Sequence, residues 1–402
     1  MKANVDGRCD PRFEEVKREF EKNFAERGEV GASVCLSVNG ETLVDLWGGM
    51  ANPEAGDPWR EDTISIVFSC SKAATALCAH ILIDRGELDP DALVSEYWPE
   101  FAKNGKEKTT VQMMLNHESA LPTLRDPVKP GGFADWDYMI RRLEDEEAFW
   151  EPGTRNGYHM INFGWTVGEL VRRVSGKSLG TFFREEVAEK TGAKFWLGLP
   201  GTEDVHIAPI RPYAPQPGDE ATEFGIKLMT EPDSIQHKSF MNTGGWDFND
   251  RKMQAAEIGG GGGLSNARGQ VAMYTPLATN DGSLVSAERL QNMTMVSTAT
   301  HRDATLLIPS RFASGFMKSM DNRRRKMGPG TSAIMGERAF GHVGAGGSIG
   351  FADPDCGLAF SYTMNQMGNG ILLNDRGQSL IDAAYRSLGY QTNAPGAWVK
   401  TA

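Results

Sequence analysis

The sequence lacks three features that would place it in other classes of protein: long hydrophobic runs, paired cysteines and an excess of positive charge. No segment approaches the roughly 18 consecutive apolar residues of a membrane span, and residues 1–6 lack the apolar stretch of a secretory signal. With 42 basic and 53 acidic residues the formal net charge is -11, which disfavours nucleic acid as a partner because phosphate backbones require clustered Lys and Arg. We therefore expect a soluble, cytoplasmic protein that binds neither membranes nor nucleic acid.

Metal-binding patterns are absent as well. The five cysteines are scattered and odd in number, with no Cys-x-x-Cys pair, which favours reduced thiols over disulfides or a zinc site. The seven histidines form no His-Glu-x-x-His pattern. The sequence therefore implies no metal and no other cofactor. The one basic run, residues 323–326, is typical of a solvated loop, and we assign it no function.

What is present is an ordinary globular composition. The 402 residues are 40% hydrophobic and 24% charged, enough for two domains or one large domain with an insertion. Residues 11–27 carry apolar side chains at helical spacing. Residues 31–38 and 41–47 are β-rich and flank Asn39-Gly40, a strong hairpin signal. The chain is thus predicted to open with a helix followed by two strands.

The middle of the chain is mainly helical in pattern. Residues 70–85 are rich in Ala and Leu and are followed by Gly86, which predicts a mostly buried helix. Residues 201–257 are rich in Pro, Asp, Asn and Gly, and we expect a long loop that lines a site. Other expected helices are 111–115, 139–146, 162–174, 179–190, 266–277 and a final one at 380–388, with strands at 348–352 and 358–364.

Ser69 and Lys72 form the pattern with the clearest chemical meaning. They lie where a strand-like run, residues 63–68, gives way to the predicted helix, and positions three apart on a helix are neighbours. The helix N-terminus and burial favour an oxyanion and a neutral lysine, and a hydroxyl beside a neutral amine is an activated nucleophile. Ser-x-x-Lys alone is a weak signal, and the alternative is a helix-capping serine followed by a solvent-exposed lysine.

Two later segments add to this pattern. Tyr158 follows a Pro-Gly-Thr loop at residues 152–154, and a phenol near a lysine can act as a general base. Alternatively the ring only anchors the loop to the core. His342 opens a glycine-rich entry to a strand, which lets backbone approach a ligand closely. Alternatively this segment is a bulge with a buried loop histidine.

The order of Ser69-x-x-Lys72, Tyr158 and His342-x-Gly344 resembles the penicillin-recognising serine hydrolases: class C β-lactamases, DD-peptidases and family VIII carboxylesterases. Residues 110–117 also resemble the helix of that family that reads Thr-hydrophobic-Arg-x-Leu-Leu-Thr-His. The resemblance implies an α/β (α+β) fold of the β-lactamase/transpeptidase type. In it, residues 1–68 and 257–402 form an antiparallel sheet flanked by helices, residues 69–256 form an inserted, mainly helical lobe, and the active site lies between the two lobes.

The resemblance also implies roles for individual residues. Ser69 is expected to be the acylated nucleophile and Lys72 its proton acceptor. Tyr158 is expected to be the base that shuttles protons with Lys72. The backbone N–H groups of Ser69 and Ala345 are expected to form the oxyanion hole.

Two departures from the β-lactamase pattern bear on the substrate. Where β-lactamases have Lys-Thr-Gly, residues 342–344 are His-Val-Gly, without a permanent cation for a carboxylate. Where they have Tyr-x-Asn, Met160 replaces the amide. Both departures favour small neutral esters with short acyl chains, as in family VIII carboxylesterases, and leave weak hydrolysis of some cephalosporins open. We expect His342 and Gly344 to contact substrate, and Trp246 and Phe248 to form the pocket wall.

The leading interpretation is therefore a serine carboxylesterase acting on small-molecule esters. Residues 346–350 match the Gly-x-Ser-x-Gly elbow of α/β-hydrolases, but no histidine follows Ser348 in the chain, so we expect Ser348 to be structural. We expect Cys70 to be a small buried residue. The alternatives are a β-lactamase, DD-peptidase or acyltransferase of the same fold, and a non-catalytic scaffold or binding member of the fold.

Overall fold

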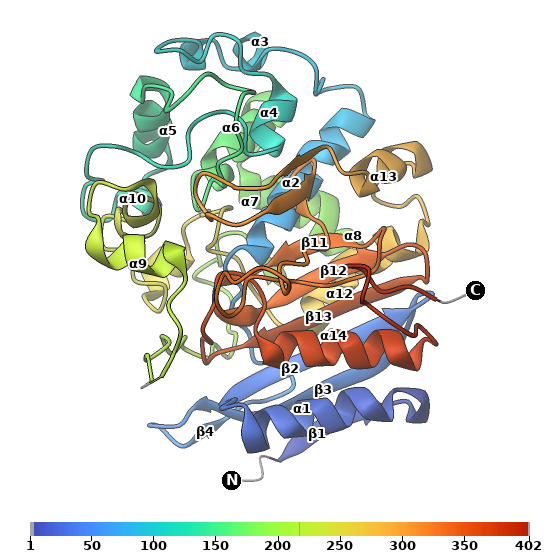
Figure 1. The fold of residues 1–402 in the computed structure, drawn as a ribbon. Helices are drawn as coiled ribbons and strands as arrows, with labels where there is room; N and C mark the ends of the chain where they lie inside the picture. Colours follow the sequence, from blue (N-terminus) through green and yellow to red (C-terminus); the bar gives the residue numbers. More distant parts are fainter. Residues whose placement is uncertain (1–3, 217, 401–402) are drawn as a thin grey trace.

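A large antiparallel sheet joins the two ends of the chain (Figure 1). The computed structural model describes residues 4–216 and 218–400, so the extreme ends that the sequence assigned to the sheet lobe lie outside the described residues. The strand order is β1-β3-β2-β13-β12-β11-β10-β9-β8, with β4 paired to β3, and each pairing is antiparallel. The strands are β1 (Val5–Cys9), β2 (Gly31–Val38), β3 (Glu41–Asn52), β4 (Asp57–Pro58), β8 (Thr298–Thr300), β9 (Ser310–Ala313), β10 (Phe316–Met317), β11 (Phe340–Val343), β12 (Ile349–Asp353) and β13 (Leu358–Met364).

The hairpin between β2 and β3 forms at the predicted turn. Asn39 and Gly40 have φ of 51° and 87°, the left-handed values that a two-residue hairpin of this kind requires. Successive residues of β2 then face opposite sides of the sheet, so that Leu36 lies on one core and Cys35 on the other. The sheet therefore separates two hydrophobic cores.

Helices cover both faces of the sheet. On one face α1 (Glu14–Glu26) and α14 (Asp375–Ser387) pack side by side, and their apolar side chains meet those of the central strands. On the other face α12 (Ala267–Thr279) packs against β2, β12 and β13. This arrangement confirms the expected β-lactamase/transpeptidase-like fold at the level of an antiparallel sheet flanked by helices.

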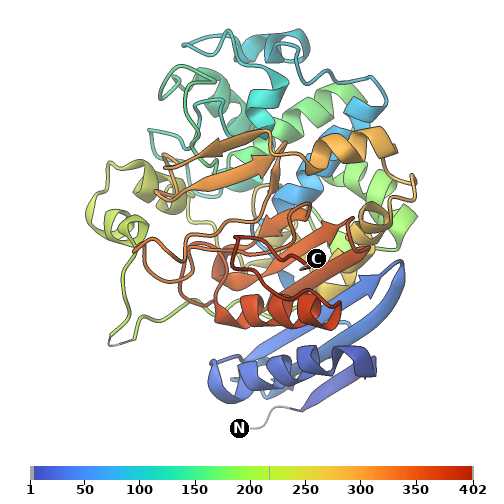
Figure 2. The same cartoon turned by 45° about the vertical axis from the view of Figure 1, so that its right-hand side comes forward.

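The residues between β5 (Ser65–Ile66) and β7 (Leu264–Ser265) are mainly helical and lie beyond the α12 side of the sheet, toward the top of Figure 2. At their centre is α2 (Cys70–Asp84), which is buried along nearly its whole length because apolar or small residues occupy all of its sides. The remaining helices here are α3 (Val94–Tyr97), α4 (Val111–Leu115), α5 (Trp136–Asp145), α6 (Phe163–Ser175), α7 (Leu179–Phe183), α8 (Glu189–Thr191), α9 (Glu223–Thr230), α10 (Ile235–Met241) and α11 (Arg251–Gln254), with α13 (Ala287–Thr294) following α12. A short strand, β6 (Phe195–Trp196), pairs with β7.

Several sequence expectations need correction. The chain opens with β1, not with a helix, because this polar edge strand forms through backbone pairing with β3 and carries no apolar alternation. Residues 201–257 are not one long loop: α9, α10 and α11 form there, each too short to show a helical repeat. In residues 63–68 the regular strand is only β5, beside an isolated bridge between Ile64 and Ile207, and the final helix begins at Asp375, before the predicted residue 380.

Candidate active site

Ser69 lies in a tight turn between β5 and α2. The preceding residue, Phe68, has a φ of 45°, a left-handed conformation that costs a bulky side chain on the order of 1–3 kcal/mol. The Ser69 side chain makes no capping hydrogen bond to α2, and Ser69 is 8% exposed. The hydroxyl is thus free for chemistry, and the helix-capping interpretation that the sequence left open is wrong.

Lys72 lies one helical turn after Ser69 and is fully buried, so it is not a solvent-exposed lysine. Its Nζ is 2.9 Å from Ser69 Oγ and 2.6 Å from each of two carbonyl oxygens, those of Met160 and Gly260. The glycine run at 259–263 makes this contact feasible, because a Cβ on Gly260 would lie 2.0 Å from the Ile161 carbonyl oxygen. Three separate segments therefore meet at the lysine amine.

Burial determines the charge of Lys72. It lowers the pKa of Lys72 well below the ordinary 10.5, since no carboxylate in the described part of the chain forms an ion pair with the amine. A neutral amine has two N–H donors and one lone pair. When the amine is neutral, the carbonyls of Met160 and Gly260 can accept its two N–H groups, and its lone pair is then available to the Ser69 hydroxyl 2.9 Å away. The arrangement can therefore take a proton from Ser69.

Tyr158 and His342 complete the polar cluster. The Tyr158 ring centroid is 4.8 Å from Lys72 Nζ, and the Tyr158 hydroxyl is 3.5 Å from His342 Nε2. His342 Nδ1 is 2.7 Å from the Val343 carbonyl oxygen, which can only accept, so Nδ1 carries the proton and Nε2 accepts from Tyr158. Burial lowers the pKa of His342 to about 3 and raises the pKa of Tyr158. Both groups are neutral at neutral pH.

The two backbone amides expected to form the oxyanion hole are free to bind a ligand. Those of Ser69 and Ala345 donate no hydrogen bond within the residues that the structure describes. Gly344 brings their segments together, because a Cβ there would lie 2.3 Å from the Val67 carbonyl oxygen. Gly344 thus packs against the turn before Ser69. The free amides can stabilise negative charge on a reacting carbonyl oxygen.

An apolar wall borders Ser69. The ring centroids of Phe68 and Phe248 are 5.5 Å apart in an edge-on contact, and Trp246 lies 6.1 Å from Phe248. The same cluster contains Ile66, Ile210, Ala345 and Met367. The structure therefore places Phe248 against the residue that precedes Ser69 and Trp246 against Phe248, in one apolar cluster.

The architecture and this cluster match known proteins. The beta-lactamase family profile matches residues 16–384. The chain belongs to the beta-lactamase family. The esterase/beta-lactamase LipL of Mycobacterium tuberculosis is 30% identical over 383 residues, which are 92% of this chain and 85% of LipL.

Two solved structures of this family are similar across nearly the whole chain. A family VIII carboxylesterase has a TM-score of 0.81 and 36% identity, covering 96% of this chain and 100% of its own. A penicillin-binding protein homologue from Caulobacter crescentus has a TM-score of 0.81 and 34% identity with the same coverage. The resemblance inferred from the motifs is thus confirmed.

Sequence reasoning missed several groups of this beta-lactamase family site. The carbonyls of Met160 and Gly260 are backbone atoms, for which residue types give no signal. Asp303 accepts the Tyr158 N–H although it lies 145 positions later in the chain. His117 and His159 form a buried pair behind Tyr158, with their Nδ1 atoms 3.1 Å apart. The Thr-to-His segment at 110–117 was the only sequence hint of these groups.

Two further residues singled out in the sequence are buried beside this cluster. The Ser348 hydroxyl is fully buried and has no hydrogen-bond partner in the described residues, as suits a structural residue. Cys70 is also buried, and its Sγ donates to the His342 carbonyl at 3.3 Å. The described residues contain no group of three or more His, Cys, Asp or Glu side chains that could hold a metal ion, and their helices are all too short or too polar to cross a membrane.

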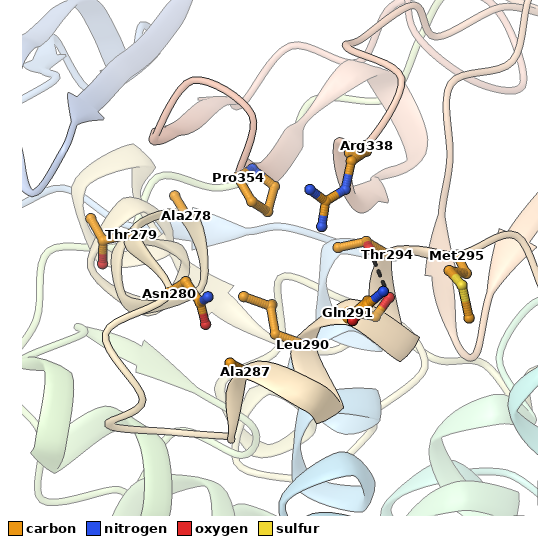
Figure 3. Close-up of a pocket in the computed structure, with 10 residues that line it drawn as sticks. All are labelled: Ala278, Thr279, Asn280, Ala287, Leu290, Gln291, Thr294, Met295, Arg338 and Pro354. Carbon is orange, nitrogen blue, oxygen red and sulfur yellow. Dashed lines mark hydrogen bonds between the residues drawn. The ribbon is translucent and has the colours of Figure 1, made fainter.

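Two hollows elsewhere in the structure contain none of the cluster's polar residues. One of about 520 Å³ lies between α12 and α13, where Arg338 points toward Thr294 and Gln291 (Figure 3). Another of about 780 Å³ reaches from the start of α14 to Met367, which also belongs to the apolar wall beside Ser69.

Proposed function

We propose that this serine hydrolase is a carboxylesterase that cleaves small, neutral esters through an acyl-enzyme on Ser69. The observation that carries the proposal is the buried Lys72 amine, held by two carbonyls and aimed at the Ser69 hydroxyl. A fully buried lysine without a counter-ion is unfavourable for stability alone and is expected where a base is needed. A non-catalytic scaffold would not require it.

In the acylation step, Ser69 Oγ attacks the ester carbonyl carbon while its proton passes to Lys72 Nζ. The carbonyl oxygen becomes an oxyanion, which the N–H groups of Ser69 and Ala345 stabilise. The C–O bond to the alcohol then breaks. The Tyr158 hydroxyl donates its proton to the leaving alkoxide and recovers a proton from Lys72, so the amine is neutral again.

Deacylation reverses these proton transfers. A water molecule takes the place of the alcohol, gives a proton through Tyr158 to Lys72, and attacks the acyl carbon. The bond to Ser69 Oγ breaks and the oxygen regains its proton from Lys72 Nζ. The carboxylic acid product leaves, and Ser69, Lys72 and Tyr158 return to their initial states.

The charge around Ser69 supports a neutral substrate. His342 is uncharged, and Met160 offers no side-chain amide, so the site has neither a permanent cation for a carboxylate nor a partner for a substrate amide. The aromatic wall of Phe68, Trp246 and Phe248 suits a short acyl chain. The similarity to a family VIII carboxylesterase supports ester hydrolysis, and the similarity to LipL, named esterase/beta-lactamase, supports weak β-lactam hydrolysis beside it.

The test is intact-protein mass spectrometry after brief incubation with p-nitrophenyl acetate or butyrate. We expect an acyl adduct that maps to Ser69 and is absent from Ser69→Ala. Ser348→Ala is the matched control, because Ser348 is buried, and it should acylate normally. Turnover by Ser69→Ala, or an adduct on Ser348, would overturn the proposal.

A further inference from the structure

Asp303 is a fully buried carboxylate close to the cluster that the proposed mechanism does not use. It lies in the turn between β8 and β9. Oδ1 accepts the N–H groups of Thr305 at 2.8 Å and Leu306 at 2.9 Å, and Oδ2 lies 3.4 Å from the Ser310 hydroxyl. No cation in the described residues forms an ion pair with it. Only N–H and O–H donors therefore stabilise the carboxylate, and burying it in this way costs folding free energy.

The remaining contact of Asp303 reaches the active site. The Tyr158 N–H donates to both carboxylate oxygens, at 3.0 Å to Oδ1 and 3.2 Å to Oδ2. The neighbouring Ala304 N–H donates to the Asn156 carbonyl at 2.9 Å, so the same turn forms a second hydrogen bond to the loop that carries Tyr158. Tyr158 itself lies in neither a helix nor a strand. Its backbone position therefore depends on contacts of this kind.

We propose that Asp303 is a positioning residue for the reaction at Ser69: by anchoring the Tyr158 backbone, it holds the phenol where it can protonate the leaving alcohol. The inference rests on the proposed function of Ser69, Lys72 and Tyr158. The Tyr158 ring has to reach Lys72 and His342 at once, and a displacement of about 1 Å at a reacting group can cost about 100-fold in rate. Asp303 supplies the anchor from a part of the chain remote in sequence.

A second buried aspartate provides a matched control. Asp353, on β12, is also buried and has no ion-pair partner in the described residues, and it accepts the Tyr385 hydroxyl at 2.7 Å and the Asp355 N–H at 3.1 Å. Like Asp303, it is a buried carboxylate stabilised by hydrogen bonds without a cation, but it contacts none of the groups around Ser69. Asp353→Asn therefore shows how activity changes when a buried aspartate without a contact to Tyr158 is replaced.

The experiment compares two butyrate esters with different leaving groups. p-Nitrophenolate leaves readily without a proton, whereas the alkoxide of ethyl butyrate needs one from Tyr158. We expect Asp303→Ala to lower kcat/KM for ethyl butyrate about 100-fold, and for p-nitrophenyl butyrate by less than about 10-fold. The readout is the ratio of kcat/KM for ethyl butyrate to kcat/KM for p-nitrophenyl butyrate. Tyr158→Phe should lower this ratio as well, and Asp353→Asn should leave it at the wild-type value. Rates are expressed per active site, counted from the p-nitrophenol burst.

Asp303→Asn is a more conservative variant, used in case Asp303→Ala does not fold. Its amide keeps one acceptor oxygen but sets an NH₂ group against the Tyr158 N–H, so we expect an intermediate change in the ratio. A wild-type ratio in the folded Asp303 variants, with a changed ratio in Tyr158→Phe, would overturn this inference alone. A wild-type ratio in Tyr158→Phe would overturn both the inference and the role of Tyr158, and loss of the Ser69 adduct would be the separate failure of the proposed function.

Discussion

Lys72 and Arg376 are both buried basic residues, at 0% and 4% exposure, yet their surroundings differ completely. Arg376 lies at the start of α14, where its guanidinium is 2.9 Å from Glu29 Oε1 and donates to the Gln366 carbonyl at 2.7 Å. Lys72 has two carbonyls and a hydroxyl but no carboxylate. One buried basic group has a carboxylate partner, and the other has none in the described residues.

The pKa values of the two groups show the consequence. Burial works to lower the pKa of Arg376, but Glu29 and Tyr362 together outweigh it and the pKa is raised. For Lys72 burial acts without such opposition, and the pKa falls well below 10.5. The same desolvation therefore acts on an ion pair that joins the loop after α1 to α14, and on an amine without a carboxylate partner, whose pKa it lowers toward that of a base.

The largest expected effect comes from replacing the base. Lys72→Met keeps the side-chain volume but has no lone pair on nitrogen, so we expect the acylation rate to fall by about 10²–10⁴-fold. Lys72→Arg should fall as far, because a guanidinium does not deprotonate. Stopped-flow measurement of the p-nitrophenol burst checks this. Retention of more than about a tenth of the wild-type rate by Lys72→Met would contradict a base role.

The second prediction breaks the ion pair. Glu29→Gln leaves the Arg376 charge buried without an anion, and we expect a loss of about 3–5 kcal/mol in the free energy of unfolding with normal acylation per active site. The control is Glu15→Gln, which removes a partly exposed pair between α1 and Arg386 of α14 and should cost at most about 1 kcal/mol. Urea unfolding measures both variants. Equal losses would show that burial is not the deciding difference.

The third prediction concerns pH. Lys72 accepts the Ser69 proton only as a neutral amine, so kcat/KM is present above the pKa of Lys72 and is lost as the pH falls through it. Because burial lowers that pKa, we expect the acid limb of the profile to lie well below 10.5. The profile is measured with p-nitrophenyl butyrate. An acid limb near 10.5 would mean that Lys72 stays an ammonium, like the permanently charged Arg376.

The smallest expected effect concerns the apolar wall beside Ser69. Phe248→Ala removes a ring that packs on Phe68, so we expect the preference for butyrate over acetate esters to fall about 10-fold in kcat/KM. Phe149→Ala, which removes a half-buried ring stacked on Arg125, serves as the control and should not change the preference. An unchanged preference in Phe248→Ala would remove Phe248 from the acyl pocket.

Features with a local cause were predictable from the sequence. Helix α2 follows from an Ala-rich stretch ended by Gly86, and the β2–β3 hairpin follows from Asn39-Gly40. The short helices α9, α10 and α11 were missed, although Thr222, Ser234 and Asp250 cap them. A helix of four to eight residues is too short to show a 3.6-residue period, so its capping residue alone looks like a loop residue.

Features with a distant cause were not predictable. β1 has no apolar alternation, and β3 supplies the hydrogen bonds that make it a strand. Asp303 carries no motif, and only the fold brings it to the Tyr158 N–H. The order of motifs pointed to Tyr158 and His342, but nothing local indicated that their side chains meet at 3.5 Å.

The spacing of Ser69 and Lys72 follows from the sequence, because three positions along a helix always place two side chains together. Whether Lys72 is a base does not follow from that spacing. A solvent-exposed lysine at the same position would remain an ammonium. The tertiary structure decides the matter by enclosing the amine among α2, the Met160 carbonyl and the Gly260 carbonyl without any carboxylate, since desolvation is the sum of everything packed around a group.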